Sequence, residues 1–198
     1  MDKVFSNKKF AFALIGVLLS LQLTQSIANW CGGGFNGGSL ILCILMLGLL
    51  VLVGVGIAKK NKLLTIVSGV SILSVVIYAL VSQYSGLIQD WNKKTIPLEA
   101  LIGSIFAAAG TLLLVSCLVL AILKTFKPNK DFRTINIVFC LIAFIFFLVK
   151  TLIPLFSGAF SDPNFDTWYP FYSFSRDFFA LFMTLLIPCV WHQVDAKE

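Results

Sequence analysis

Residues 10–58 decide the fold of this chain, and they read FAFALIGVLLSLQLTQSIANWCGGGFNGGSLILCILMLGLLVLVGVGIA. These 49 residues contain no charged side chain, and one helix needs only about 20 to cross the hydrocarbon core of a bilayer. The run is interrupted at residues 29–38, where five of ten residues are glycine, a composition typical of a turn. The sequence therefore predicts a hairpin of two membrane-spanning helices, near residues 10–28 and 39–58.

The composition of the whole chain agrees with this hairpin. Of its 198 residues, 59% are hydrophobic and only 12% are charged, and the mean hydropathy is +0.95. Soluble domains carry about 45–50% apolar and about 25% charged residues, and so few charges cannot cover a water-exposed surface. The composition excludes a soluble enzyme, a disordered chain and a nucleic-acid-binding domain, and it predicts one integral membrane domain over residues 1–198.

Four more apolar segments follow the hairpin, separated by polar or charged loops. Pro97 and Glu99 suit the first turn of the fourth helix, where proline is tolerated and the helix dipole favours an anion. The expected spans are residues 10–28, 39–58, 63–82, 97–123, 133–156 and 175–193. The expected fold class is thus an all-α, polytopic transmembrane helix bundle with six spans.

The positive charges predict the orientation of this bundle. Eleven of the fifteen lie on the side that holds both termini, three on the other side, and Lys150 lies inside a span. The eleven are Lys3, Lys8, Lys9, Lys59, Lys60, Lys62, Lys124, Lys127, Lys130, Arg133 and Lys197, and the three are Lys93, Lys94 and Arg176. Because cytoplasmic loops carry an excess of Lys and Arg, we expect both termini to lie in the cytoplasm. The membrane is expected to be the cell or plasma membrane, and the cations are expected to lie near its anionic lipids.

The first span has a second interpretation as a secretory signal peptide. Lys8 and Lys9 precede the apolar run, and Ser26-Ile27-Ala28 resembles a small-x-small cleavage site. Cleavage after Ala28 would leave five spans and the same orientation for the rest. We expect the segment to be retained.

Motifs for catalysis or cofactor binding are absent from the sequence. It contains no H-E-x-x-H, no G-x-S-x-G and no pair of intramembrane aspartates. The single histidine, His192, cannot build a metal cluster or ligate a haem on both faces, and we expect it at the membrane interface. The cysteines, Cys31, Cys43, Cys117, Cys140 and Cys189, form no C-x-x-C. Four of them lie in apolar runs and are expected to be small buried hydrophobes. We expect no enzymatic activity, no cofactor and no metal ion.

Lys150 is the most informative single residue in the sequence. A charge at the centre of a span costs at least about 2.5–3.5 kcal/mol, but Lys150 lies near the outer end, where its ammonium group can reach the head groups. The alternative is a buried ion pair, with Glu99 as the first candidate partner and Asp177 as the second. Such a pair could join helices or bind a polar solute.

Uncharged polar residues form weaker patterns. Ser68, Ser71 and Tyr78 fall at helical spacing on the third span, Gln22 and Gln25 lie together on the first, and Asn136 lies near the inner end of the fifth. They predict either a polar path between helices or ordinary inter-helix hydrogen bonds, worth about 0.6 kcal/mol each.

Small residues on the fourth span form two ridges that let helix backbones approach closely. One ridge is Ala100, Ser104 and Ala108, and the other is Gly103, Ala107 and Thr111. Their partner could be another helix of this chain, a second copy, or another membrane protein.

The expected outer loop, residues 157–174, has seven aromatic residues among eighteen. Such rings settle at the membrane–water boundary, which predicts an interfacial belt or a re-entrant cap. The functional alternative is a lid over an outward cavity or a partner surface. Its residues would be Asp162, Asp166, Trp168, Tyr169 and Tyr172.

These observations predict a transport-related membrane component, namely a small solute-binding or permeation subunit. The alternative is a non-catalytic accessory, assembly or immunity factor that binds another membrane protein. Membrane lipids are expected partners in both cases, and nucleic acid is not.

Overall fold

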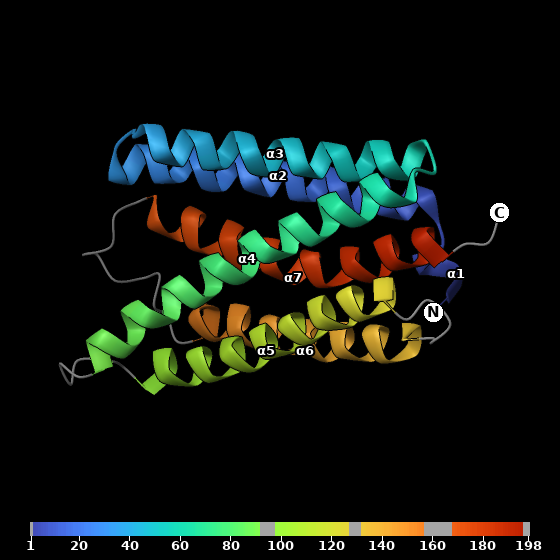
Figure 1. Cartoon of the computed structure of the whole chain (residues 1–198). Coiled ribbons are helices and arrows are strands. Elements are labelled where there is room, and N and C mark those ends of the chain that lie inside the picture. The colour runs from blue at the N-terminus through green and yellow to red at the C-terminus, as the bar shows by residue number, and fades with distance from the viewer. Residues whose placement is uncertain (1, 92–97, 127–131, 157–167, 196–198) are drawn as a thin grey trace. The chain divides into compact units, whose positions relative to one another are not determined.

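The computed structural model describes residues 2–91, 98–126, 132–156 and 168–195, and these residues contain helices and no strand (Figure 1). Residue contacts divide the chain into two compact units. Unit 1 comprises Met1–Ile72 and Pro163–Glu198, and unit 2 comprises Leu73–Asp162. Each unit is described by itself below, and the single domain over residues 1–198 stays a prediction.

Six long helices and one short helix make up the described residues. They are α1 (Asp2–Phe5), α2 (Lys8–Gly33), α3 (Gly37–Ala58), α4 (Lys62–Trp91), α5 (Leu98–Phe126), α6 (Arg133–Phe156) and α7 (Tyr169–Asp195). Five of the six are long and apolar enough to cross a membrane, and in α4 the apolar stretch among the residues with described side chains is Lys62–Tyr78. The all-α bundle of membrane-type helices is confirmed, and the cytoplasmic location of both termini stays a prediction.

The expected hairpin is formed by α2 and α3 in unit 1, but its turn is narrower than residues 29–38. Only Gly34–Asn36 separate the helices, and Gly34 adopts a φ of 82°, which glycine reaches without steric cost. Asn36 caps α3 by accepting a hydrogen bond from Ser39 N at 2.7 Å, and the Trp30 indole N–H donates to Ser39 Oγ at 2.7 Å. These bonds hold the helix ends together, so the flanking glycines remain helical.

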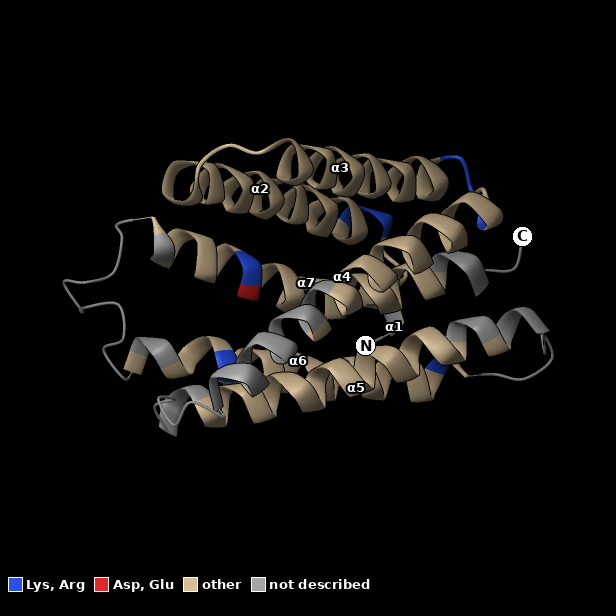
Figure 2. Ribbon diagram, turned by 60° about the vertical axis from the view of Figure 1, so that its left-hand side comes forward, with Lys and Arg blue, Asp and Glu red and all other residues tan. Residues whose placement is uncertain are grey.

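A polar contact also joins α2 and α3 at the end of the hairpin opposite the turn. Lys8 Nζ donates to the carbonyl oxygen of Ile57 at 3.3 Å, which places a cation at the C-terminal end of α3, where the helix dipole favours it. Figure 2 shows the lysines that begin α2 and those that follow α3 at this same end of unit 1. Within unit 1, the structure thereby brings together the lysines of residues 8–9 and 59–62, five of the eleven cations that the sequence assigns to one side.

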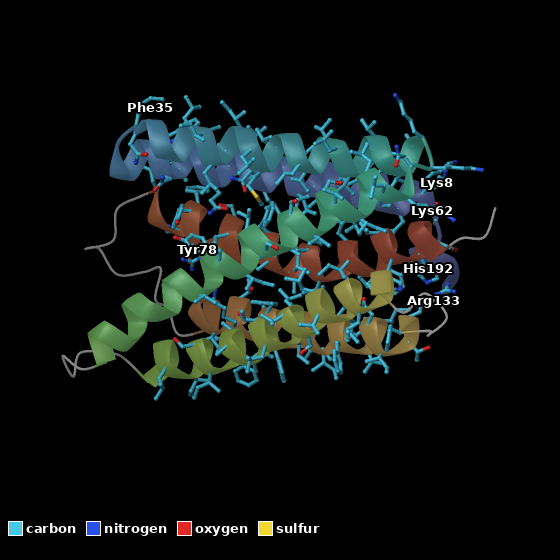
Figure 3. All side chains as sticks on the ribbon, viewed as in Figure 1. Lys8, Phe35, Lys62, Tyr78, Arg133 and His192 are labelled. Atoms are coloured by element: carbon cyan, nitrogen blue, oxygen red, sulfur yellow. The ribbon has the colours of Figure 1, made fainter. Side chains whose placement is uncertain are left out.

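The turn between α3 and α4 is a Schellman motif with lysine at the position that usually holds glycine. Lys60 has a φ of 53°, Asn61 N donates to Gly56 O at 2.9 Å, and Lys60 N donates to Ile57 O at 3.4 Å. This is the hydrogen-bond pattern that closes a helix C-terminus. Asn61 then begins α4 by accepting from Leu64 N at 3.0 Å. Lys62 follows at once, and Figure 3 shows it at this corner.

Lys60→Gly is expected to stabilise the protein. A non-glycine residue in the left-handed region costs about 1–2 kcal/mol, so relief should raise the free energy of unfolding by about 1 kcal/mol. Thermal unfolding of the purified protein in detergent micelles measures the change. Lys59→Gly removes the same charge at a residue whose φ is −82°, and it should lower the melting temperature. Equal responses of the two variants would contradict this explanation.

Among the helices that extend beyond their expected bounds, α4 and α7 differ most. The third helix was expected to end at residue 82, and this end is wrong because α4 continues to Trp91; the expected loop 157–174 is wrong for residues 169–174, which begin α7. Polar composition indicates where a helix can leave the membrane, but it does not end the helix. Pro170 falls in the first turn of α7, where its missing N–H is not needed, and Tyr172 N donates to Trp168 O at 3.1 Å.

In unit 1, α7 packs along α2 and runs antiparallel to it (Figure 1). The short α1 covers the C-terminal end of α7, where the rings of Phe5 and His192 stack with centroids 6.4 Å apart. His192 is 4% exposed. The short helix that precedes α2 thus shields this histidine, and its expected position at the membrane interface stays a prediction.

In unit 2, α5 and α6 form a second antiparallel hairpin that is in contact along its length. Gly103 and Ala107 on α5 are buried, and a Cβ added at Gly103 would lie 3.9 Å from Lys150 Cγ. Ser104 and Ala108 are half-buried, and the side chain of Ala100 lies outside the described residues. One of the two predicted ridges therefore packs against α6 of the same chain.

Candidate functional site

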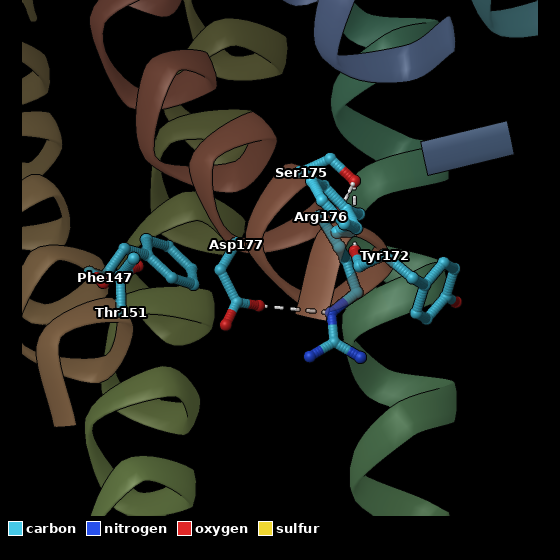
Figure 4. Close-up of polar contacts among 7 residues, drawn as sticks. Phe147, Thr151, Tyr172, Ser175, Arg176 and Asp177 are labelled. Atoms are coloured by element: carbon cyan, nitrogen blue, oxygen red, sulfur yellow. Dashed lines mark hydrogen bonds and ion pairs between the residues drawn. The ribbon is translucent and has the colours of Figure 1, made fainter. Parts of the chain in front are cut away.

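Charged side chains of opposite sign lie next to each other in the first third of α7. Arg176 Nε donates to Asp177 Oδ1 at 3.1 Å, and the two side chains are 25% and 6% exposed (Figure 4). Adjacent helical residues do not face one another, so the Arg176 side chain bends along the helix to reach the carboxylate. The contact runs through the Nε edge of the guanidinium, and Figure 4 draws it as a single bond.

The guanidinium of Arg176 also lies over an aromatic ring. Its Cζ is 5.7 Å from the centre of the Tyr172 ring, a distance at which a cation is attracted to the π-face. Tyr172 is four residues earlier and shares the same face of the helix. The cation is thus held between a ring and a carboxylate, two groups that offset its removal from water.

Buried hydroxyl and amide groups lie at the same end of unit 1. Ser173 and Ser175 on α7 are buried, and Ser175 Oγ donates to Phe171 O at 2.6 Å. On α2, Gln22 Nε2 donates to Ser26 Oγ at 3.4 Å, and both side chains are buried. Because the two helices are antiparallel, these groups lie toward the same end of unit 1: at 1.5 Å per residue, Ser26 and Gln22 are about 10 and 16 Å from the end of α2, and Ser173 and Ser175 about 6 and 9 Å from the start of α7. We call Gln22, Ser26, Ser173, Arg176 and Asp177 the α2–α7 polar group.

The helix that carries this charged pair is the most enclosed of the five membrane-type helices. In the most apolar 18-residue stretch of α7, 61% of the residues are buried, against 28–33% in the corresponding stretches of the other four helices. A helix facing lipid on one side could place its charges toward head groups at little cost, but α7 is largely surrounded by protein. Ionisable groups in such a position are rare and are usually functional.

The described residues test neither of the partners expected for Lys150. Its stem packs against α5 beside Gly103, and the residue is half-buried, as expected of a lysine that covers apolar surface with its methylene groups. The side chain of Glu99 lies outside the described residues. Asp177 belongs to unit 1 and Lys150 to unit 2, and pairing of these two residues stays a prediction.

The polar residues of α4 differ in their surroundings. Ser68 is buried and donates to Leu64 O at 2.6 Å, and Ser71 donates to Val67 O at 2.8 Å. Tyr78 is 75% exposed (Figure 3). The hydroxyl groups of both serines thus bond to their own helix, so their presence alone does not require a polar path.

The expected aromatic loop is only partly described. Asp162 and Asp166 lie outside the described residues. Trp168 is 42% exposed and its ring lies 6.2 Å from that of Phe171. Tyr169 and Tyr172 belong to the first turn of α7, and Tyr172 contacts Arg176. The segment expected to form a lid or partner surface therefore includes helical residues, and one of them, Tyr172, lies beside the charged pair.

A second polar cluster, missed by the sequence reasoning, lies between α5 and α6. The sulfur atoms of Cys117 and Cys140 are 3.5 Å apart, and Cys140 Sγ lies 3.6 Å from Asn136 Oδ1. All three residues are at most 1% exposed, and Asn136 Nδ2 has no hydrogen-bond partner. The sequence held a signal for this cluster. Cys117 and Cys140 lie at similar distances from the ends of two consecutive helices, so an antiparallel hairpin would bring them to the same level.

The other cysteines agree with the expectation. Cys43 and Cys189 are buried, and Cys31 is exposed, although it lies in the last turn of α2 rather than in a loop. In the described part of the chain, no group of three His, Cys, Asp or Glu side chains could hold a metal ion.

Comparison with protein families, with curated proteins and with solved structures found no match for this chain. The functional argument therefore depends on its own residues.

Proposed function

We propose that this protein is a transport-related component of a cell membrane, with both termini in the cytoplasm, and that the α2–α7 polar group binds a small solute bearing a carboxylate. The observation that carries the proposal is the Arg176–Asp177 pair on the most enclosed helix. A chain with so few charges keeps two of them where burial is costly.

The chemistry of the pair suits an anionic or zwitterionic solute. A guanidinium binds carboxylates with directed hydrogen bonds, and Arg176 uses its Nε edge for Asp177. A solute carboxylate would compete with Asp177 for the guanidinium, and an amino group on the same solute would then be attracted to the released aspartate. Ser173, Gln22 and Ser26 add buried hydroxyl and amide groups toward the same end of unit 1.

The alternative of an accessory, assembly or immunity factor receives less support. It depended in part on the small-residue ridges, and Gly103 on one of them packs against Lys150 and Ile153 of α6 in the same chain. The aromatic segment likewise includes Tyr172, which contacts Arg176. A partner membrane protein or a homo-oligomer stays a prediction.

Solute binding is tested by thermal unfolding of the purified protein with a panel of amino acids, mono- and dicarboxylates and uncharged controls of matched size. We expect at least one carboxylate to raise the melting temperature in a concentration-dependent way, because a ligand that binds only the folded state stabilises it. Arg176→Gln should abolish this shift. Thr24→Ala is the matched control, since Thr24 is exposed and bonds only to its own helix. Stabilisation by uncharged solutes alone, or an unchanged shift in Arg176→Gln, would contradict the proposal.

The pair should also show a non-additive effect on stability. Arg176→Met removes a cation from a carboxylate that is 6% exposed, and breaking a buried pair costs more than replacing both partners. Because Arg176 is partly exposed, we expect a loss of about 1–3 kcal/mol. The double variant Arg176→Met with Asp177→Leu should be more stable than Arg176→Met alone. Additive losses in a double-mutant cycle would show that the two charges are not coupled.

A further inference from the structure

We propose that five lysines at one end of unit 1 bind the phosphate headgroup of one anionic phospholipid. They are Lys8, Lys9, Lys59, Lys60 and Lys62, and we call them the lysine corner. The corner lies where α2 begins, α3 ends and α4 begins, at the opposite end of unit 1 from the α2–α7 polar group. The proposal therefore does not rest on solute binding. The sequence predicts only that cations lie near anionic lipids, whereas this site holds one lipid at defined residues.

One carbonyl oxygen joins the two parts of the lysine corner. Lys8 Nζ donates to Ile57 O at 3.3 Å, and Lys60 N donates to the same oxygen at 3.4 Å. The ammonium group at the start of α2 therefore lies beside the backbone of the turn between α3 and α4. Figure 3 shows Lys8 and Lys62 at this same end of unit 1. The fold thus brings together cations from segments that lie 49 residues apart in the sequence.

Nearby carboxylates do not balance the charges of the lysine corner. The sequence has no aspartate or glutamate between Asp2 and Asp90. In the part of the chain that the structure describes, none of the five ammonium groups pairs with a carboxylate, and Asp177 bonds to Arg176 far from them. Positive side chains gathered in this way create a local potential that attracts anions.

Three of the lysines also lie where a helix dipole disfavours a cation. Lys8 and Lys9 are the first two residues of α2, and Lys62 is the first residue of α4. Neither helix has an acidic residue in its first turn. The N-terminus of a helix carries a partial positive charge and favours an anion such as phosphate. An anion at the corner would therefore be attracted by two helix dipoles in addition to the lysines.

Lys60 provides an independent observation. Its φ is 53°, in the left-handed region that glycine reaches without steric cost and that other residues adopt at a cost. The turn around it is closed by the hydrogen bond from Asn61 N to Gly56 O at 2.9 Å, so the strained residue is held in place. Strain kept at one residue points to a use for its side chain. Binding of an anion is a use that only a cationic side chain supplies.

Exposed apolar side chains beside the corner favour a lipid over a soluble phosphate. Leu63 follows Lys62 directly and is 73% exposed, and Phe12 lies one turn after Lys8 and is 42% exposed. Both α2 and α3 are long and apolar enough to cross a membrane, so their shared end is at the level of the headgroups. A phosphate bound by the lysines would place its acyl chains along these apolar side chains, which a soluble phosphate cannot contact.

The test compares two phospholipids with identical acyl chains, phosphatidylglycerol and phosphatidylcholine, added to the purified full chain in detergent. Native mass spectrometry should show one phosphatidylglycerol retained per chain in preference to phosphatidylcholine. Phosphatidylglycerol should also raise the melting temperature more, because a ligand that binds only the folded state stabilises it. Glycerol 3-phosphate has the phosphate without acyl chains, and it should give no shift at the same concentration.

Variants of the corner assign the lipid to these residues. Lys60→Gly combined with Lys62→Gln should weaken phosphatidylglycerol binding by about 25-fold, since each basic side chain near an anionic surface contributes about fivefold. Because Lys60→Gly relieves strain, the variant should melt no lower than the unmodified protein when lipid is absent, and unfolding cannot explain the loss. Lys62→Arg keeps the cation and should bind normally.

The matched control removes two cations that the sequence assigns to the same side of the membrane but that belong to unit 2. It combines Lys127→Gln with Lys130→Gln and should keep its affinity for phosphatidylglycerol. Four results would overturn the proposal. They are equal stabilisation by the two phospholipids, an equal shift with glycerol 3-phosphate, unchanged binding in the corner variant, and a loss in the control as large as in the corner variant.

Discussion

Gly56→Ala should prevent this protein from reaching its folded state. A Cβ at residue 56 would clash with Thr65 Oγ1, and it would also lie 2.9 Å from Thr65 N and 3.1 Å from Thr65 Cα. Backbone atoms cannot rotate away as a side chain can. The corner between α3 and α4 would have to open, at a cost of about 3 kcal/mol or more.

The hydrogen bonds around this corner leave it little freedom to open. Gly56 O accepts from Asn61 N at 2.9 Å, while Thr65 N and Thr65 Oγ1 donate to Asn61 O at 3.1 and 2.8 Å. Shifting Thr65 away from residue 56 would break the bonds that close α3 and begin α4. The expected result is a large loss of monodisperse protein after detergent extraction, measured by size-exclusion chromatography against total expression.

Two further variants make this prediction specific. Gly48→Ala is the control, because Gly48 lies on the same helix with nothing within 4 Å of an added Cβ, and it should fold normally. Thr65→Ala combined with Gly56→Ala should not restore folding, since the backbone contacts remain. Recovery in that double variant would show that the obstacle is only the threonine hydroxyl.

Gly110→Leu should give the second largest loss, by separating α5 from α6. A Cβ at residue 110 would lie 3.0–3.3 Å from three ring atoms of Phe147, and Phe147 is fully buried. The added side chain has no space in this hairpin. We expect the free energy of unfolding to fall by about 2–3 kcal/mol, measured by thermal or denaturant unfolding in micelles.

Here the obstacle is a side chain, so a compensating change should work. Phe147→Ala alone should cost about 3–5 kcal/mol through the cavity it leaves, and combining it with Gly110→Leu refills much of that volume. The double variant should be more stable than the sum of the two losses predicts. Gly48→Leu, which adds the same side chain at an open position, should be neutral. Strict additivity would mean that residues 110 and 147 do not meet.

Much of the helical architecture follows from local properties of the chain. Residues 10–58 predict two helices because they are apolar for twice the thickness of a bilayer and broken by glycine, and α6 has the predicted bounds of 133–156. Helix ends were less accurate, since the polar stretch 83–91 is helical and Pro170 lies within the first turn of α7. The four-residue spacing of small residues correctly indicated a close-packed face on α5. It did not identify Gly110, because that residue is three positions from Ala107 rather than four.

The amino-acid sequence by itself determined that this is a multi-helix, membrane-type protein and which residues begin and end several of its turns, because hydropathy and capping act over a few neighbouring residues. The tertiary structure decided which side chains meet. Asp177 bonds to Arg176 beside Tyr172, Cys117 meets Cys140 over an orphaned amide, and Gly56 touches the backbone of Thr65. Which sides of two apolar helices face each other depends on packing of shapes along their whole length, and composition does not encode that choice.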